Sequence, residues 1–145
     1  MGESEPGRAR GRGRTSARRI SLEVLVEADL RGASVAELLA ARGEEEDLPP
    51  YAVVLVEGIS ASGPEVDEAI TEHLRSDWPL DRLGAVERAI MRIGSWELLA
   101  GDVPGEVAVD EAVELAKRYA SLRAARLVNG VLGAMLRRRQ GAGHG

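Results

Sequence analysis

The chain has 145 residues, of which 44% are hydrophobic and 30% charged, with a formal net charge of −5 and no cysteine. The absence of cysteine excludes disulfides, thiolate nucleophiles and cysteine-based zinc sites, and no apolar run is long enough for a transmembrane helix. The length fits one domain, and we expect a soluble cytoplasmic protein without a membrane association.

Charge is distributed unevenly along the chain. Residues 1–19 hold six arginines and two acids, residues 20–114 hold six arginines and 22 acids, and residues 115–145 hold seven basic residues and no acid. Nucleic acids respond to the local field rather than to the average charge, so a mildly acidic protein can still bind them through a basic patch. The two basic ends are therefore the first candidates for a binding surface.

The first 15 residues mix glycine and arginine with almost no apolar side chain. Such a segment cannot offset the entropy of its own ordering, so we expect a disordered arm over residues 1–15 that can follow a phosphate backbone. A solubilising tail is the alternative. A single helical domain is expected over residues 16–139, followed by a flexible tail over residues 140–145.

Helical periodicity begins at Ser16 and recurs along the rest of the chain. Capping signals at Ser34 and Ser62, a break at Trp78-Pro79 and a stop at Gly101 separate the helices. The expected helices cover about 16–31, 34–43, 50–59, 62–74, 83–101, 109–120 and 128–139. No segment alternates with a period of two, so the sequence predicts an all-α fold of about seven helices.

Enzyme chemistry finds little support in this sequence. The only histidines are His73 and His144, which form no pair at metal-ligand spacing, and no phosphate-binding loop is present. Adjacent acids such as Asp110 and Glu111 diverge on a helix and are better explained as a solvated face. We therefore expect no catalytic residue, no metal and no cofactor.

Basic residues also gather near the expected seventh helix. Lys117, Arg118, Arg123 and Arg126 precede or begin it, and Asn129 lies three residues past Arg126 on the same face. Gly130 lies inside an apolar helical run, where glycine costs about 1 kcal/mol relative to alanine. Either the close approach of another helix or that of a ligand backbone would explain it.

Several motifs in order resemble the NusB family of bacterial transcription antitermination factors. They are RAIMRIGSWELL, DVP, VAVDEAVELAKRY and LVNGVL, preceded by the basic arm, and the resemblance covers about residues 14–136. It implies two roughly perpendicular three-helix bundles and no catalytic activity. It also implies single-stranded boxA-like leader RNA and the ribosomal protein NusE as partners, within an antitermination complex with RNA polymerase. A homodimer is possible when the protein is free.

The resemblance also assigns residues to these roles. The implied RNA-binding residues are Arg12, Arg14, Arg18, Arg19, Arg92, Arg123, Leu127 and Asn129. The implied partner-binding residues are Asp81, Val86 and Glu87. Val86 could instead be plain core, and Arg92 could be a surface charge.

One segment departs from the family pattern. The chain has ASLRAARL before VNGVL, with Leu127 where the family often has an aromatic residue and with Arg123 and Arg126 added. Such a change favours phosphate binding over base stacking. Two other functions stay open: an accessory RNA-binding module linked to ribosomal RNA methylation, and a helical adaptor that binds only protein.

Overall fold

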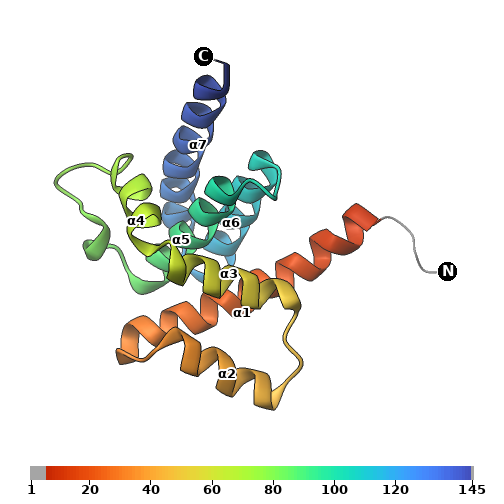
Figure 1. Ribbon diagram of the computed structural model, residues 1–145. Coiled ribbons are helices and arrows are strands. Elements are labelled where there is room, and N and C mark those ends of the chain that lie inside the picture. Colours follow the sequence, from red (N-terminus) through yellow and green to blue (C-terminus); the bar gives the residue numbers. More distant parts are fainter. Residues whose placement is uncertain (1–5, 145) are drawn as a thin grey trace. The chain divides into compact units, whose positions relative to one another are not determined.

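The computed structural model describes the backbone of residues 6–144 and the side chains of residues 14–141. Over that backbone the chain forms seven α-helices, one three-residue 3-10 helix and no strand, which confirms the all-α class predicted from the sequence (Figure 1). The chain divides into two compact units, residues 1–60 and 61–145, where the sequence predicts a single domain over residues 16–139. Each unit buries hydrophobic side chains of its own.

Helix α1 (Pro6–Arg31) begins earlier than the sequence predicts. The expected disordered arm covers residues 1–15; residues 1–5 lie outside the described part of the chain, and the rest of the arm is helical. Arginine is a good helix former, proline fits the first helical position, and an existing helix extends one hydrogen bond at a time. The stable helix that follows Thr15 can therefore propagate into the arm. Gly32 ends α1 with a φ of 63°, a conformation that favours glycine.

Helices α2 (Val35–Glu45) and α3 (Pro50–Ala61) pack with α1 around the core of the first unit. The predicted cap of α2 is confirmed, because the backbone N–H of Glu37 donates to Ser34 Oγ at 3.3 Å. All three helices contribute buried side chains, which are Ala17, Ile20 and Val24 of α1, Leu39 of α2, and Ala52 and Val56 of α3. Each helix thus buries one apolar stripe, as a period of 3.6 residues requires.

One arginine ties α2 to α1 beside this core. Arg42 Nη2 donates to Glu23 on α1, and Arg42 Nε donates to Glu46 Oε2 at 2.7 Å. The hydrogen bond to Glu46, followed by the one to Glu23, raises the pKa of Arg42 above its ordinary value. The guanidinium therefore stays charged and holds both carboxylates.

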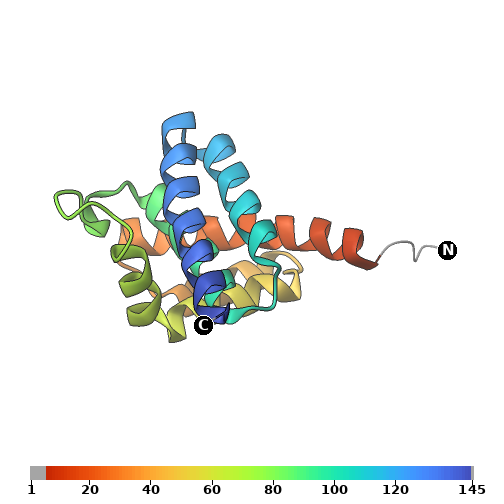
Figure 2. The same cartoon turned by 90° about the horizontal axis from the view of Figure 1, so that it is seen from above.

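The second unit contains α4 (Gly63–Thr71), α5 (Ala85–Ala100), α6 (Gly105–Tyr119) and α7 (Leu122–His144), with the short helix η1 (Leu80–Arg82) between α4 and α5. Helices α5, α6 and α7 pack against one another, and α4 packs against α5 and α7; α7 lies along α6 in Figure 2. The expected helix over about 83–101 corresponds to α5 and the residues just before it, and Leu83, Ile90 and Ile93 of this stretch are buried. Glu97 of the same helix is also buried, whereas the neighbouring Trp96 is half-buried.

Two glycines allow the helices of the second unit to pack closely. A Cβ at Gly94 would overlap with Leu132 of α7, and a Cβ at Gly105 would overlap with Leu136 of the same helix. Gly130 is different, because nothing lies within 4 Å of a Cβ built there. A close helix crossing, one of the two explanations offered for Gly130, is therefore absent from the described residues.

Helix α7 continues into the residues that the sequence predicts to be a flexible tail. It runs to His144, and Gly145 lies outside the described residues. Side chains near its end reach neighbouring elements: Arg138 Nη1 forms an ion pair with Glu72 at 3.2 Å, and Gln140 Nε2 donates to Glu106 at 3.3 Å. These contacts give the last turns partners that local composition does not reveal.

Candidate nucleic-acid interface

The N-terminal arginines do not share one environment. The side chain of Arg12 lies outside the described residues. The guanidinium of Arg14 lies 4.5 Å from the centre of the Tyr51 ring, and that of Arg18 lies 6.0 Å from the same centre. Such distances are typical of cation–π contacts. Tyr51 of α3 therefore gathers two of the arginines that the resemblance assigns to RNA.

Arg18 and Arg19 are adjacent but differ sharply in exposure. Arg18 is only 1% exposed and is therefore not a surface cation of the kind expected from its place in the sequence. Arg19 is 39% exposed over its side chain and forms an ion pair with Glu23 at 3.1 Å, one turn away. Because consecutive residues of a helix point about 100° apart, one faces the packed side of α1 and the other faces solvent.

Arg92 joins two helices of the second unit. Its Nε and Nη2 donate to the two carboxylate oxygens of Asp67 on α4, at 2.8 and 3.0 Å. This parallel arrangement is the strongest geometry that an arginine and a carboxylate can form. Arg92 is thus neither an isolated surface charge nor a cation without a partner.

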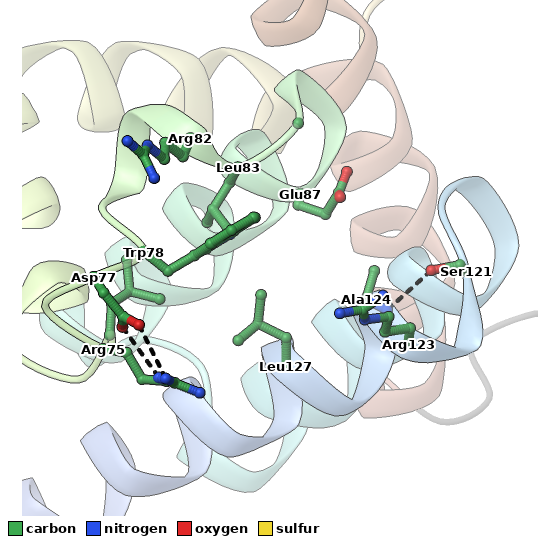
Figure 3. Close-up of a pocket in the computed structure, with 12 residues that line it drawn as sticks. Arg75, Asp77, Trp78, Arg82, Leu83, Glu87, Ser121, Arg123, Ala124 and Leu127 are labelled. Atoms are coloured by element: carbon green, nitrogen blue, oxygen red, sulfur yellow. Dashed lines mark hydrogen bonds and ion pairs between the residues drawn. The ribbon is translucent and has the colours of Figure 1, made fainter.

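A groove of about 680 Å³ opens on the second unit. It is bounded by the segment between α4 and η1, the first turn of α5, and the start of α7 (Figure 3). Its lining residues are Leu74, Arg75, Asp77, Trp78, Arg82, Leu83, Gly84, Glu87, Ser121, Arg123, Ala124 and Leu127. Three residues that the resemblance singles out, Glu87, Arg123 and Leu127, therefore lie in one depression although up to 40 positions separate them in the sequence.

The α7 wall of the groove is built by a local cap. Ser121 Oγ accepts a hydrogen bond from the backbone N–H of Ala124 at 3.0 Å, which satisfies one donor of the first turn of α7. Arg123 lies within this turn, and its side chain is exposed. In the described part of the chain it forms no ion pair. A cation beside the positive end of a helix dipole is a good place for an incoming anion.

The opposite wall is fixed by Arg88, which the sequence did not indicate. Its Nη1 donates to the backbone carbonyl of Leu83 at 2.6 Å, with longer contacts to the carbonyls of Leu80 at 3.3 Å and Asp81 at 3.4 Å. These carbonyls belong to η1 and to the residue that ends it. One side chain of α5 therefore holds η1 in place beside the groove.

Glu87 belongs to the groove and also lies at the beginning of α5. A Cβ at Gly84, the residue before α5, would lie 2.8 Å from Glu87 Oε1, so the carboxylate covers the helix N-terminus. A negative charge there is stabilised by the helix dipole. Glu87 therefore has a structural role beside the partner contact that the resemblance implies.

The remaining candidates lie outside the groove lining. Asp81 is exposed on η1, Val86 is half-buried on the first turn of α5, and Asn129 is exposed on α7. Asn129 precedes Gly130, whose α-carbon faces open space. The backbone of α7 is therefore accessible to a ligand at this point.

Several residues of the groove had no place in the sequence-based assignment, and Trp78 and Arg82 are the two with the most distinctive side chains. Both follow α4; the sequence predicts a helix break at Trp78-Pro79 and gives Arg82 no role. A tryptophan beside a proline in a polar connection was the available signal. A role for Trp78 can be inferred only from the fold, which places Leu127 on the other side of the same groove.

Other kinds of site find no counterpart in residues 14–141. No group of three histidine or acidic side chains among them is arranged to hold a metal ion. Within the described helices, none is both long and apolar enough to cross a membrane.

Two comparisons with known proteins identify the same family. Residues 15–137 match the model of the NusB family. The chain is 48% identical over 125 residues to the transcription antitermination protein NusB of Saccharopolyspora erythraea, covering 83% of this chain and 84% of that protein.

Solved structures agree with this match. The fold is similar to a chain in the crystal structure of antitermination factors NusB and NusE in complex with double-stranded RNA, with a TM-score of 0.77, 36% identity and coverage of 87% of this chain and 97% of that chain. It is also similar to a chain in the crystal structure of a plectonemic RNA supercoil, with a TM-score of 0.79, 36% identity and coverage of 88% and 96%.

Proposed function

Because this chain belongs to the NusB family, we propose that it is an RNA-binding transcription antitermination factor that binds boxA-type leader RNA together with the ribosomal protein NusE. It acts without catalysis, in the cytoplasm, as part of an antitermination complex with RNA polymerase. The similar chain from a complex of NusB, NusE and RNA supports both partners.

The groove of the second unit is the observation that carries this proposal. Its lining holds three arginines and two acids, Asp77 and Glu87, of which Asp77 is paired with Arg75. The remaining guanidinium groups lie beside an aromatic ring and aliphatic side chains, a combination suited to single-stranded RNA. Arg123 and Leu127 contribute from α7, and Asn129 with Gly130 extends the surface along the same helix. An RNA strand that crosses this wall meets cations, apolar surface and accessible backbone in turn.

In the first unit, Arg14 and Arg19 are the best placed of the described arginines for phosphate contacts. Arg14 rests on Tyr51 and Arg19 on the solvent side of α1, while Arg12 belongs to the same basic segment. Arg18 is buried beside Tyr51, so it packs beneath this surface and is not exposed on it. Neutralising each phosphate releases counterions, so binding should weaken steeply as salt rises.

NusE is proposed to contact the edge formed by η1 and the first turn of α5. Asp81 is exposed there, Val86 offers a half-buried apolar side chain, and Glu87 presents a carboxylate. Arg92, further along α5, joins this helix to α4 through Asp67. Free protein that has no NusE on this edge could form a homodimer, which a sedimentation measurement with and without NusE would detect.

The test compares two variants that each lose one exposed arginine. Fluorescence anisotropy with a labelled single-stranded boxA RNA, in the presence of NusE, should give a weaker affinity for Arg123→Ala than for Arg31→Ala, whose arginine pairs with Glu27 on α1. The log of the affinity should fall with the log of salt at about −0.7 per neutralised phosphate, and Arg123→Ala should reduce that slope. Equal affinities and slopes for the two variants, or no binding by the unaltered protein, would overturn the proposal.

A further inference from the structure

Trp78 is an unusual residue on the surface of this protein. The chain has only two tryptophans and two tyrosines, and Trp78 is the most exposed of them at 51%. A large aromatic side chain left in water gives up the burial that normally stabilises it. Its position in the groove supplies a reason, because a ligand that covers the ring would recover that burial.

The position of Trp78 is defined by its own turn. Its backbone N–H donates to the carbonyl of Arg75 at 3.0 Å, and Pro79 follows with a φ of −69°. Within the same turn Arg75 donates two hydrogen bonds to Asp77, at 3.1 and 3.0 Å. Because Asp77 neutralises Arg75, this pair stabilises the turn and contributes little charge to the groove.

Two other arginines supply positive charge to the groove. Arg82 and Arg123 line the groove without forming an ion pair in the described residues, and in Figure 3 the indole of Trp78 lies between them. Leu83 and Leu127 provide aliphatic surface near the ring. Among the described lining residues Trp78 is the one aromatic side chain, so any stacking of a base on an aromatic ring in the groove must use it.

We propose that Trp78 is the platform on which one unpaired base of the RNA stacks, with Arg82 and Arg123 binding the phosphates on either side of that base. This inference rests on the proposed function and names a residue for which sequence reasoning gave no role. Each guanidinium is matched by a phosphate and the indole by a base. Every nucleotide of RNA carries both a phosphate and a flat base, whereas a peptide needs particular acidic and aromatic residues to provide the same series.

Affinity measurements test the platform directly. Trp78→Ala should weaken binding of the single-stranded boxA RNA, with NusE present, by about 5- to 150-fold, the equivalent of ~1–3 kcal/mol for one base stacked on an aromatic side chain. Trp78→Phe should retain most of the affinity. Trp96→Ala is unsuitable as a control because Trp96 is half-buried, so Tyr119→Ala, which removes an exposed ring outside the groove lining, serves instead and should leave the affinity unchanged.

Fluorescence gives a second readout that does not depend on how well Trp78→Ala folds. In Trp96→Phe protein Trp78 is the sole tryptophan, and stacking of a base should quench its emission as RNA is added. RNAs with one abasic position each then locate the base. At one position the abasic change should weaken binding to the unaltered protein and have no further effect on Trp78→Ala.

The outcomes separate this inference from the proposed function. If RNA binds to Trp78→Ala with unchanged affinity, or binds to Trp96→Phe protein without quenching Trp78, the platform is overturned and the proposed function stands. If Trp78→Ala weakens binding to NusE without RNA, the groove belongs to the protein partner and the platform is again overturned. If the unaltered protein with NusE does not bind RNA at all, the proposed function itself fails.

Discussion

Arg92 and Asp67 form two parallel hydrogen bonds of 2.8 and 3.0 Å that join α5 to α4, across 25 positions of the sequence. Both side chains are about one-third exposed, at 29% and 37%, so solvent screens part of their attraction. The pair is therefore a moderate contributor to stability that holds α5 against α4.

Removing this pair should affect the free energy of unfolding more than it affects RNA binding. Arg92→Ala should reduce the free energy of unfolding by about 1 kcal/mol in urea titrations, since the guanidinium makes both bonds with one carboxylate. A double-mutant cycle with Asp67→Ala should show coupling between the two positions. If Arg92 instead contacts RNA directly, Asp67→Ala would free the guanidinium and preserve or raise RNA affinity, while Arg92→Ala would lower it.

The adjacent residues Arg18 and Arg19 offer a matched comparison in α1. Arg18→Ala should destabilise the protein by about 1–3 kcal/mol, because it empties a buried position beside Tyr51 and leaves the groups that contact the guanidinium without it. Arg19→Ala should cost at most about 0.5 kcal/mol, since it breaks only an exposed ion pair with Glu23. Thermal unfolding by circular dichroism measures both. Equal losses of stability for the two variants would mean that Arg18 is not packed as the structure indicates.

The helices of this chain were predictable because local patterns determine them. The stripe of Ile90 and Ile93, the cap at Ser34 and the stop at Gly101 all follow from residues within a few positions of each other. The candidate site was less accessible to such reasoning. Glu87 and Arg123 come together only through packing of α5 with α7, and the partner of Arg92 lies 25 positions away.

Other features were missed for a similar reason. The burial of Arg18 depends on a ring supplied by α3, and Trp78 gains a role only when Leu127 of α7 lies in the same groove. The start of α1 at Pro6 was missed because composition indicates whether a segment can form a core and not whether a neighbouring helix can extend into it.

Arg88 should affect the groove without contacting a ligand. Arg88→Ala removes the donor shared by the carbonyls of Leu80, Asp81 and Leu83, so η1 should open more often and amide hydrogen exchange over residues 80–83 should rise. The RNA affinity of Arg88→Ala should fall at the same time. Lysine at this position should rescue only part of the effect, because its shorter side chain does not place the ammonium where Nη1 of Arg88 lies. Unchanged exchange in this segment would show that other contacts hold η1.

Gly130 and Gly94 should respond in opposite ways to the same added methyl group. Gly94→Ala should destabilise the protein by about 1–3 kcal/mol, because its Cβ would overlap with Leu132 and Ala112 in a packed crossing. Gly130→Ala meets nothing within 4 Å and should stabilise α7 by up to about 1 kcal/mol, since alanine favours the helix.

A residue that costs stability without any packing benefit should serve a ligand. Gly130→Ala should therefore raise the urea midpoint and at the same time weaken RNA binding, because the methyl group keeps a nucleic-acid backbone away from α7 beside Asn129. Affinity and unfolding measured on the same preparation separate the two effects. A variant that is more stable and binds RNA as well as the unaltered protein would remove Gly130 from the interface.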